Sequence, residues 1–183
     1  MRPGEGTAKL AVKVARPAVE QVWAWLGEVA DPEIPVISIV DLGIVRDVRW
    51  EDEIDDERLV VSITPTYSGC PATSVIAHDI DAALRAHGID ALRLETRISP
   101  PWTTDWISEA GRQRLREYGI APPANSAGAG NPLRRMTRGP APIECPQCGS
   151  ANTVKVSEFG STPCKAQYRC ADCLEPFDYF KCI

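Results

Sequence analysis

The spacing of apolar residues predicts a run of alternating helices and strands in the first two thirds of the chain. Apolar side chains recur at helical intervals in residues 17–27, which predicts an amphipathic helix. Residues 44–50 and 59–64 are rich in β-branched residues and predict two strands. A second helical period covers residues 71–87 and ends before a glycine, and residues 89–98 predict a third strand.

The order strand, helix, strand in residues 59–98 predicts a βαβ unit, whose crossover should be right-handed and whose strands should be parallel. Ligands of such units gather beyond the carboxyl ends of the strands. These ends are residues 64–71 and 99–106, so the two loops should lie at one edge of the sheet. With a last helix predicted at residues 104–118, we expect a small α/β (α+β) domain with a three-stranded mixed sheet at residues 16–119.

The rest of the chain has a different composition. Residues 1–15 are a short tail. Residues 120–141 are rich in Ala, Pro and Gly and have no apolar period, which predicts a linker. Residues 142–183 contain three short runs typical of strands and should form a second, smaller module.

One cysteine stands out in the loop after the second predicted strand, where the sequence reads Thr64-Pro65-Thr66-Tyr67-Ser68-Gly69-Cys70-Pro71. Pro71 suits the first helical position because its missing N–H is not needed there, which places Cys70 at or beside the N-cap. The free N–H groups of a helix N-terminus favour a thiolate over a thiol. Cys70 is therefore a candidate ligand for a soft metal or cluster, the alternative being a small buried apolar residue.

Three carboxylates are candidate partners of Cys70. Asp31 and Glu33 lie in a loop that two prolines stiffen, and Asp105 lies in the loop after the third predicted strand. Carboxylates at these positions would help to orient a metal or cluster that binds transiently to Cys70. The alternative is that these acidic loops are only solvated.

Two Cys-x2-Cys pairs, separated by 21 residues, predict a metal site in the C-terminal module, with the ligands Cys145, Cys148, Cys170 and Cys173. Four thiolates saturate zinc in a tetrahedron, although they also hold iron. A module of about 40 residues buries too little apolar surface to fold alone, so we expect a structural Zn²⁺ ion. Cys164 and Cys182 remain open as substitute ligands, a separate thiol pair or spare thiols.

Composition and charge narrow the choice of compartment and partner. No apolar run is long enough to span a membrane, so we expect a cytoplasmic protein that binds no membrane. Because the cytoplasm is reducing, seven cysteines, an odd number, favour metal ligands or reactive thiols over disulfides. Residues 1–119 carry 13 Lys and Arg against 20 Asp and Glu. This acidic balance argues against a nucleic acid partner.

The sequence lacks the signatures of a self-contained enzyme. His78 and His87 lie on one predicted helix without a Glu-x-x-His pair, and we expect both to be surface or packing residues. No dinucleotide-binding fingerprint or P-loop occurs. We therefore expect a protein that is not an enzyme and that binds metal through Cys70.

Four motifs carry a resemblance to a known family: Asp31-Pro32-Glu33-Ile34-Pro35, Asp41-Leu42-Gly43-Ile44-Val45, the Cys70 loop, and Trp102-Thr103-Thr104-Asp105-Trp106. They resemble the iron-sulfur assembly domain family of small α/β cluster assembly factors. The paired C-terminal cysteines and Phe159-Gly160-Ser161-Thr162-Pro163-Cys164-Lys165 narrow the resemblance to members associated with phenylacetate degradation.

The resemblance implies a maturation factor for the multicomponent phenylacetyl-CoA epoxidase. Such a factor helps to install the iron-sulfur cluster of the reductase subunit or otherwise assembles the complex with its other subunits. The resemblance also assigns the family's motif positions to Cys70, Asp31 and Glu33. One cysteine cannot hold a cluster alone, so a homodimer or a partner would supply further ligands. The alternatives are a structural or electron-transfer subunit of the oxygenase and a nucleic-acid-binding ribbon protein.

Overall fold

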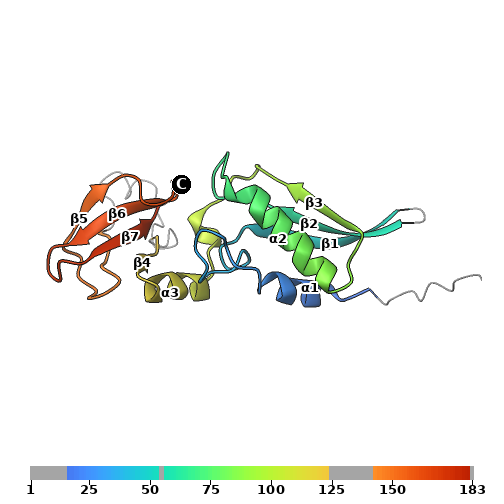
Figure 1. Cartoon of the computed structure of the whole chain (residues 1–183), viewed down its shortest axis with the longest axis horizontal. Helices are drawn as coiled ribbons and strands as arrows, with labels where there is room; N and C mark the ends of the chain where they lie inside the picture. Colours follow the sequence, from blue (N-terminus) through green and yellow to red (C-terminus); the bar gives the residue numbers. More distant parts are fainter. Residues whose placement is uncertain (1–15, 54–55, 124–141, 182–183) are drawn as a thin grey trace, which may run out of the picture.

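The computed structural model describes residues 16–53, 56–123 and 142–181. In these residues a three-stranded sheet and a four-stranded sheet lie towards opposite ends of an elongated molecule, and α3 lies between them (Figure 1). Among the described residues, no helix combines the length and apolar character that crossing a membrane requires.

The first sheet has the strand order β1-β2-β3. Strand β1 (Val45–Glu53) pairs antiparallel with β2 (Asp56–Ile63), and β2 pairs parallel with β3 (Leu92–Thr96). The parallel register places Leu59 opposite Leu92. The predicted three-stranded mixed sheet with its βαβ unit is confirmed.

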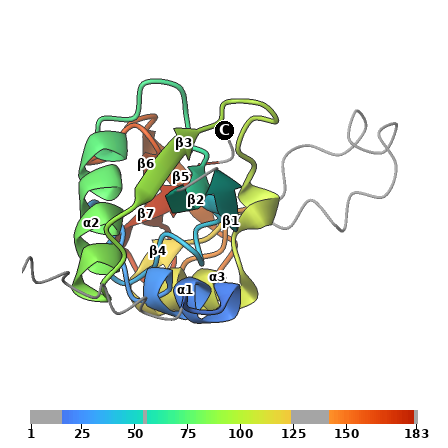
Figure 2. The ribbon, with the colours of Figure 1, turned by 90° about the vertical axis from the view of Figure 1, so that its right-hand side faces the viewer.

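Two helices cover one face of this sheet (Figure 2). Helix α1 (Val19–Leu26) and helix α2 (Ala72–Ala86) turn apolar stripes inward, because their apolar residues recur every three or four positions. The core under them contains the fully buried side chains Leu26, Ile80, Leu84, Leu59 and Ile63. This core fixes the start of α2, and therefore the position of the loop that precedes it.

The segment after β3 departs from its prediction. The single helix expected at residues 104–118 is wrong in detail, because the chain forms the 3-10 helix η1 (Thr104–Trp106) and then α3 (Glu109–Glu117). The extended residue Ile107 separates them. Ser108 begins a new helix, since its side-chain oxygen accepts a hydrogen bond of 2.9 Å from the Gly111 N–H.

The second sheet has the strand order β4-β7-β6-β5. Its strands β5 (Thr153–Ser157), β6 (Lys165–Cys170) and β7 (Pro176–Phe180) agree with the three predicted runs. Strand β4 (Ile120–Ala121) was not predicted and occupies the first two residues of the expected linker, so that boundary is corrected. Most of the expected linker, residues 124–141, and the predicted tail, residues 1–15, lie outside the described residues.

The chain forms two lobes, the first around the three-stranded sheet and the second around the four-stranded sheet, and these lobes are packed against each other. Strand β4 pairs in parallel with β7, with Ile120 opposite Asp178. The rings of Trp102 and Phe180 lie 6.0 Å apart, and Phe180 is buried in the same apolar cluster as the core of the first lobe. The C-terminal module is therefore held against the first lobe at the edge where the Cys70 loop lies.

Candidate functional site

The Cys70 loop joins β2 to α2. The N–H of Cys70 donates a hydrogen bond of 3.2 Å to the carbonyl of Tyr67, and the Cys70 carbonyl accepts one of the same length from Thr73. Pro71 is the N-cap, so α2 begins one residue later than the sequence suggests and Cys70 directly precedes the cap. The cysteine is half-buried at the start of the helix.

The acidic loop is shaped by Asp31. Its Oδ1 accepts hydrogen bonds of 2.9 Å from the backbone N–H groups of both Glu33 and Ile34, which closes a tight turn. Burial raises the pKa of Asp31, although these two hydrogen bonds oppose the rise. Asp31 therefore positions the backbone that carries Glu33.

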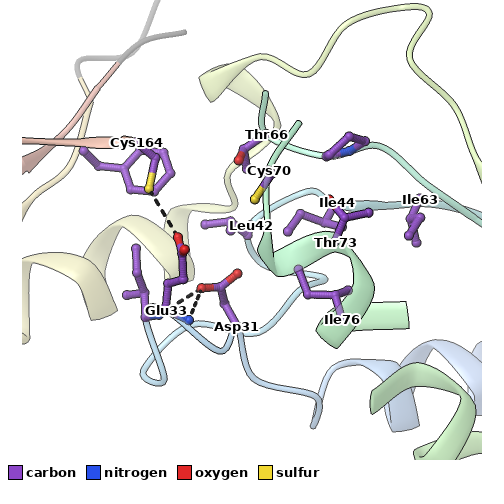
Figure 3. A pocket seen from close by; sticks show the side chains of 13 residues that line it. Asp31, Glu33, Leu42, Ile44, Ile63, Thr66, Cys70, Thr73, Ile76 and Cys164 are labelled. Carbon is purple, nitrogen blue, oxygen red and sulfur yellow. Dashed lines mark hydrogen bonds between the residues drawn. The ribbon is translucent and has the colours of Figure 1, made fainter. Parts of the chain in front are cut away.

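These residues meet in one pocket (Figure 3). Asp31, Glu33 and Cys70 line it together with apolar and hydroxyl side chains, among them Leu42, Ile44, Ile63, Thr66, Thr73 and Ile76. The pocket leaves about 10 Å³ for the centre of a water-sized sphere, which is room for about one water molecule. The structure thus brings together three of the four carboxylate and thiol residues expected around this site.

The fourth expected residue lies elsewhere. Asp105 is exposed on η1 and is not among the residues that line the pocket. His78 and His87 also lie outside it, and both are exposed. His87 stacks on Trp25 with ring centroids 4.0 Å apart, which fits the expected packing role.

The pocket also contains residues that the sequence did not indicate. Cys164 and Phe180 reach it from the C-terminal module. The Cys164 sulfur lies 3.8 Å from Oε2 of Glu33 and 3.0 Å from Oγ1 of Thr162. Burial raises the pKa of the Cys164 thiol. The sequence signal was the position of this cysteine outside the Cys-x2-Cys pairs, but nothing local placed it in the same pocket as Cys70.

Tyr67 adds a buried hydroxyl beside the pocket. Its oxygen is out of contact with solvent and has no hydrogen-bond partner among the described residues. Burial, with the nearby Cys70 and Glu33, raises the pKa of Tyr67 to about 12. Tyr67 therefore stays a neutral phenol near the thiol of Cys70.

A second cysteine cluster lies in the C-terminal lobe. The sulfurs of Cys145, Cys148, Cys170 and Cys173 all lie within 4.8 Å of one another. The sulfurs of Cys145 and Cys173 lie 3.7 Å apart, and those of Cys148 and Cys170 lie 3.6 Å apart. A tetrahedral ion with metal–sulfur bonds of about 2.3 Å needs sulfurs about 3.8 Å apart, so this metal-binding cluster fits the ion that its spacing predicts.

Hydrogen bonds from backbone and side chains support this cluster. The N–H of Cys173 lies 3.5 Å from the sulfur of Cys170, and this contact helps to lower the pKa of Cys170 to about 7. Asp172 links the two pairs by accepting hydrogen bonds from Ser150 and Asn152. Cys164 is not part of this cluster, and Cys182 lies outside the described residues.

Each Cys-x2-Cys pair is followed by a residue with a left-handed backbone, which is Gly149 (φ 75°) after the first pair and Leu174 (φ 66°) after the second. Leu174 is 60% exposed, so it gains little from packing. We expect Leu174→Gly to raise the free energy of unfolding by about 0.5–1 kcal/mol, because glycine accepts this backbone without steric cost.

Thermal unfolding of the metal-loaded protein checks this expectation. The opposite change in the first pair, Gly149→Ala, is the matched control, since a Cβ there would meet nothing within 4 Å. It should destabilise by a similar amount. A lower melting temperature for Leu174→Gly would show that the Leu174 side chain contributes more than its exposure suggests.

Comparison with known proteins matches each lobe to a family model. Residues 19–90 match a model described as an iron-sulfur cluster assembly protein, and residues 129–181 match the PaaD zinc beta ribbon domain. Over 170 residues the chain is 46% identical to an Escherichia coli protein that is named as one of the subunits of a "Putative 1,2-phenylacetyl-CoA epoxidase", covering 93% of this chain and 96% of that protein. The chain belongs to the PaaD family. The resemblance read from the sequence motifs is confirmed.

Two further comparisons concern the first lobe of this PaaD-family chain. It is 34% identical over 99 residues to the Bacillus subtilis protein named "Fe-S protein maturation auxiliary factor YitW", covering 52% of this chain and 91% of that protein. A crystal structure of a domain of unknown function, DUF59, from Bacillus anthracis aligns with a TM-score of 0.48 at 27% identity, covering 53% of this chain and 90% of that one.

Proposed function

We propose that the chain is a non-catalytic maturation factor that helps to insert the iron-sulfur cluster of the reductase subunit of phenylacetyl-CoA epoxidase. PaaD-family membership and the iron-sulfur assembly model support the class of function. The names of the Escherichia coli and Bacillus subtilis relatives support the client enzyme and the maturation role. The observation that carries the proposal is the thiol of Cys70, which lines a pocket with the carboxylates of Asp31 and Glu33.

The mechanism is transient ligation of iron by Cys70. Cys70 directly precedes the N-cap of α2, and the carboxylate of Glu33 lines the same pocket and offers a hard oxygen ligand. Asp31 holds the Glu33 backbone in place. A single thiolate leaves most coordination positions of the iron unfilled. This favours transfer of the iron to the fuller ligand set of a client protein. A partner protein, or a second copy of the chain, supplies the remaining ligands while a cluster is carried.

The four-cysteine cluster has a structural role in this proposal, and the ion is Zn²⁺. The cluster has no open ligand position once four thiolates are bound, which is the arrangement of structural zinc sites. The match to a zinc ribbon model supports the same ion. The ribbon then holds the second lobe together in the reducing cytoplasm and serves as a docking surface for the client.

The test is the cluster content of the client. The reductase subunit is purified after co-expression with the wild-type chain or with Cys70→Ala, and its iron content and visible spectrum are measured. We expect Cys70→Ala to lower the iron content of the reductase to about the level of the empty vector. Ser68→Ala is the matched control, because Ser68 is exposed in the same loop and does not line the pocket.

The Cys70→Ala protein must keep its melting temperature and its zinc content for this result to count. Equal cluster loading with wild type, Cys70→Ala and empty vector would contradict cluster delivery. A role in assembling the subunits would then be the leading account.

A second candidate is a structural or electron-transfer subunit of the oxygenase, which the name of the Escherichia coli relative favours. The two candidates differ in stoichiometry. A maturation factor can be removed once the client holds its cluster, whereas a subunit must be present in equal amount during turnover. Full epoxidase activity of a mature complex depleted of this chain would support maturation, and activity restored only by an equimolar addition would support the subunit.

A further inference from the structure

The second lobe, or ribbon, supplies one wall of the Cys70 pocket. Its residues Cys164 and Phe180 line the pocket together with Cys70, which belongs to the first lobe. Phe180 is 1% exposed and Cys164 is 4% exposed, and both are buried in the apolar cluster that forms the core of the first lobe. Cys70 packs against the same cluster. Separation of the lobes would therefore open the pocket on this side.

Polar contacts hold this wall in place. The Cys164 thiol donates a hydrogen bond of 3.8 Å to Oε2 of Glu33, across the boundary between the lobes (Figure 3). The Cys164 carbonyl accepts a hydrogen bond of 2.9 Å from the N–H of Lys181, which follows β7. The next residue, Lys165, is buried, and its ammonium lies 3.3 Å from a carboxylate oxygen of Asp178 on β7. These contacts join the acidic loop of the first lobe to β6 and β7.

Strands β6 and β7 connect this wall to the four-cysteine cluster. Strand β6 begins directly after Cys164 and ends at Cys170, which is one of the four clustered cysteines. Strand β7 begins shortly after Cys173, another of the four, and ends at Phe180. The antiparallel register places Lys165 opposite Phe180 at the pocket end. At about 3.3 Å per residue, the six residues of β6 span about 20 Å, so the cluster and the wall lie at opposite ends of one strand pair.

The order of this strand pair depends on the metal that fits the cluster. Among the described residues, the apolar cluster of the ribbon has only Ala121 and Phe177 as buried members besides two of the clustered cysteines. So small a core does not hold strands together without a bound ion. Loss of the ion should therefore release Phe180 and Cys164 from the pocket.

We propose that the ribbon is a metal-dependent cover of the Cys70 thiol. With metal in the four-cysteine cluster, Phe180 and Cys164 close one side of the pocket and restrict access to Cys70. Without the metal this side opens, and the thiol becomes accessible to large molecules. The inference rests on the proposed function only in taking Cys70 as the reactive residue, and it adds a control on that residue by a site at the far end of β6.

The cover acts on access to the thiol and leaves its chemistry unchanged. The closed pocket has room for about one water molecule, so a reagent of many atoms does not fit inside it. Cys70 is half-buried, and such a reagent reaches its sulfur only from the solvent side. Removal of the ribbon wall widens this approach. The rate at which a bulky reagent modifies Cys70 therefore measures whether the ribbon is docked.

The experiment follows alkylation of Cys70 by an excess of a bulky maleimide in the reduced, zinc-loaded full-length chain, with each cysteine quantified by mass spectrometry of its own peptide. Cys148→Ser removes a metal ligand that does not line the pocket, and we expect it to raise the rate at Cys70 about fivefold or more. Phe180→Ala removes the wall directly and should raise the rate while zinc is retained. Phe177→Ala is the matched control, because Phe177 lies on the same strand but does not line the pocket, and its rate should stay close to that of wild type.

An unchanged rate at Cys70 in Cys148→Ser, at verified loss of zinc, would overturn the proposal, as would equal rates for Phe180→Ala and Phe177→Ala at full zinc content. Hydrogen exchange in β2 shows whether the first lobe stays folded in each variant. If Phe180→Ala fails to fold or loses its zinc, Cys148→Ser alone decides. A failure here is distinguishable from failure of the proposed function, because the role of Cys70 in maturation is measured separately, as iron in the reductase subunit.

Discussion

Removal of the ribbon metal is expected to unfold the second lobe while the first sheet stays folded. The apolar cluster of that lobe has only four buried members among the described residues, Ala121, Cys145, Cys170 and Phe177, and two of them are cysteines of the metal cluster. Structural zinc contributes roughly 10–16 kcal/mol of apparent binding free energy in comparable small modules. Without it, four closely spaced thiols and little apolar surface remain to hold the strands.

Hydrogen exchange followed by mass spectrometry measures this effect after treatment with a zinc chelator. Amides of β6 and β7 should lose most of their protection, whereas those of β2 should keep theirs, because β2 lies in the separate core under α2. Restoring zinc should restore protection. Unchanged exchange in β6 at verified zinc loss would show that packing against the first lobe alone maintains the ribbon.

The substitution Gly43→Ala is expected to destabilise the protein by about 3–5 kcal/mol, near the upper end for a single change. Gly43 has φ 73°, and a Cβ there would lie 2.6 Å from both Cβ and the carbonyl oxygen of Trp106. The left-handed backbone accounts for about 1–2 kcal/mol of the loss. The remainder comes from displacing a backbone segment that cannot move alone, since Trp102 donates a hydrogen bond of 3.0 Å to the carbonyl of Leu42.

Urea unfolding measures this loss, and Gly88→Ala provides the matched control. Gly88 has φ 82° but nothing within 4 Å of a built Cβ, so only the backbone strain applies there. Equal losses in the two variants would show that the approach of Trp106 to Gly43 carries no energetic weight. The comparison also tests why the motif around Asp41, Leu42 and Gly43 needs a glycine at its third position.

Local signals in the sequence were sufficient to predict α2 and the four-cysteine cluster. The helical period before Gly88 predicted α2 to within one residue at each end, because its apolar stripe faces a sheet that buries Ile80 and Leu84 completely. The spacing of the two Cys-x2-Cys pairs likewise predicted which four sulfurs gather. In both cases the residues that interact are close in sequence or share a regular interval.

Long-range packing accounts for what the sequence did not predict. Strand β4 has two residues, too few for an alternating pattern, and its partner β7 lies near the other end of the chain. The break before α3 depends on one side chain, Ser108, whose hydroxyl also donates a hydrogen bond of 2.6 Å to Asp41. Cys164 joins the pocket only because the second lobe docks where it does.

The pairing of β4 with β7 also determines how the chain tolerates being shortened. Strand β7 has β6 on one side, and on the other side it is covered only along the part that β4 reaches. A ribbon that begins at residue 142 lacks β4, so it exposes the free backbone groups of β7 together with the site that Ala121 fills. Exposed strand edges of this kind recruit other strands and promote aggregation. We therefore expect β4 to protect the ribbon from self-association, and a ribbon that begins at residue 142 to aggregate.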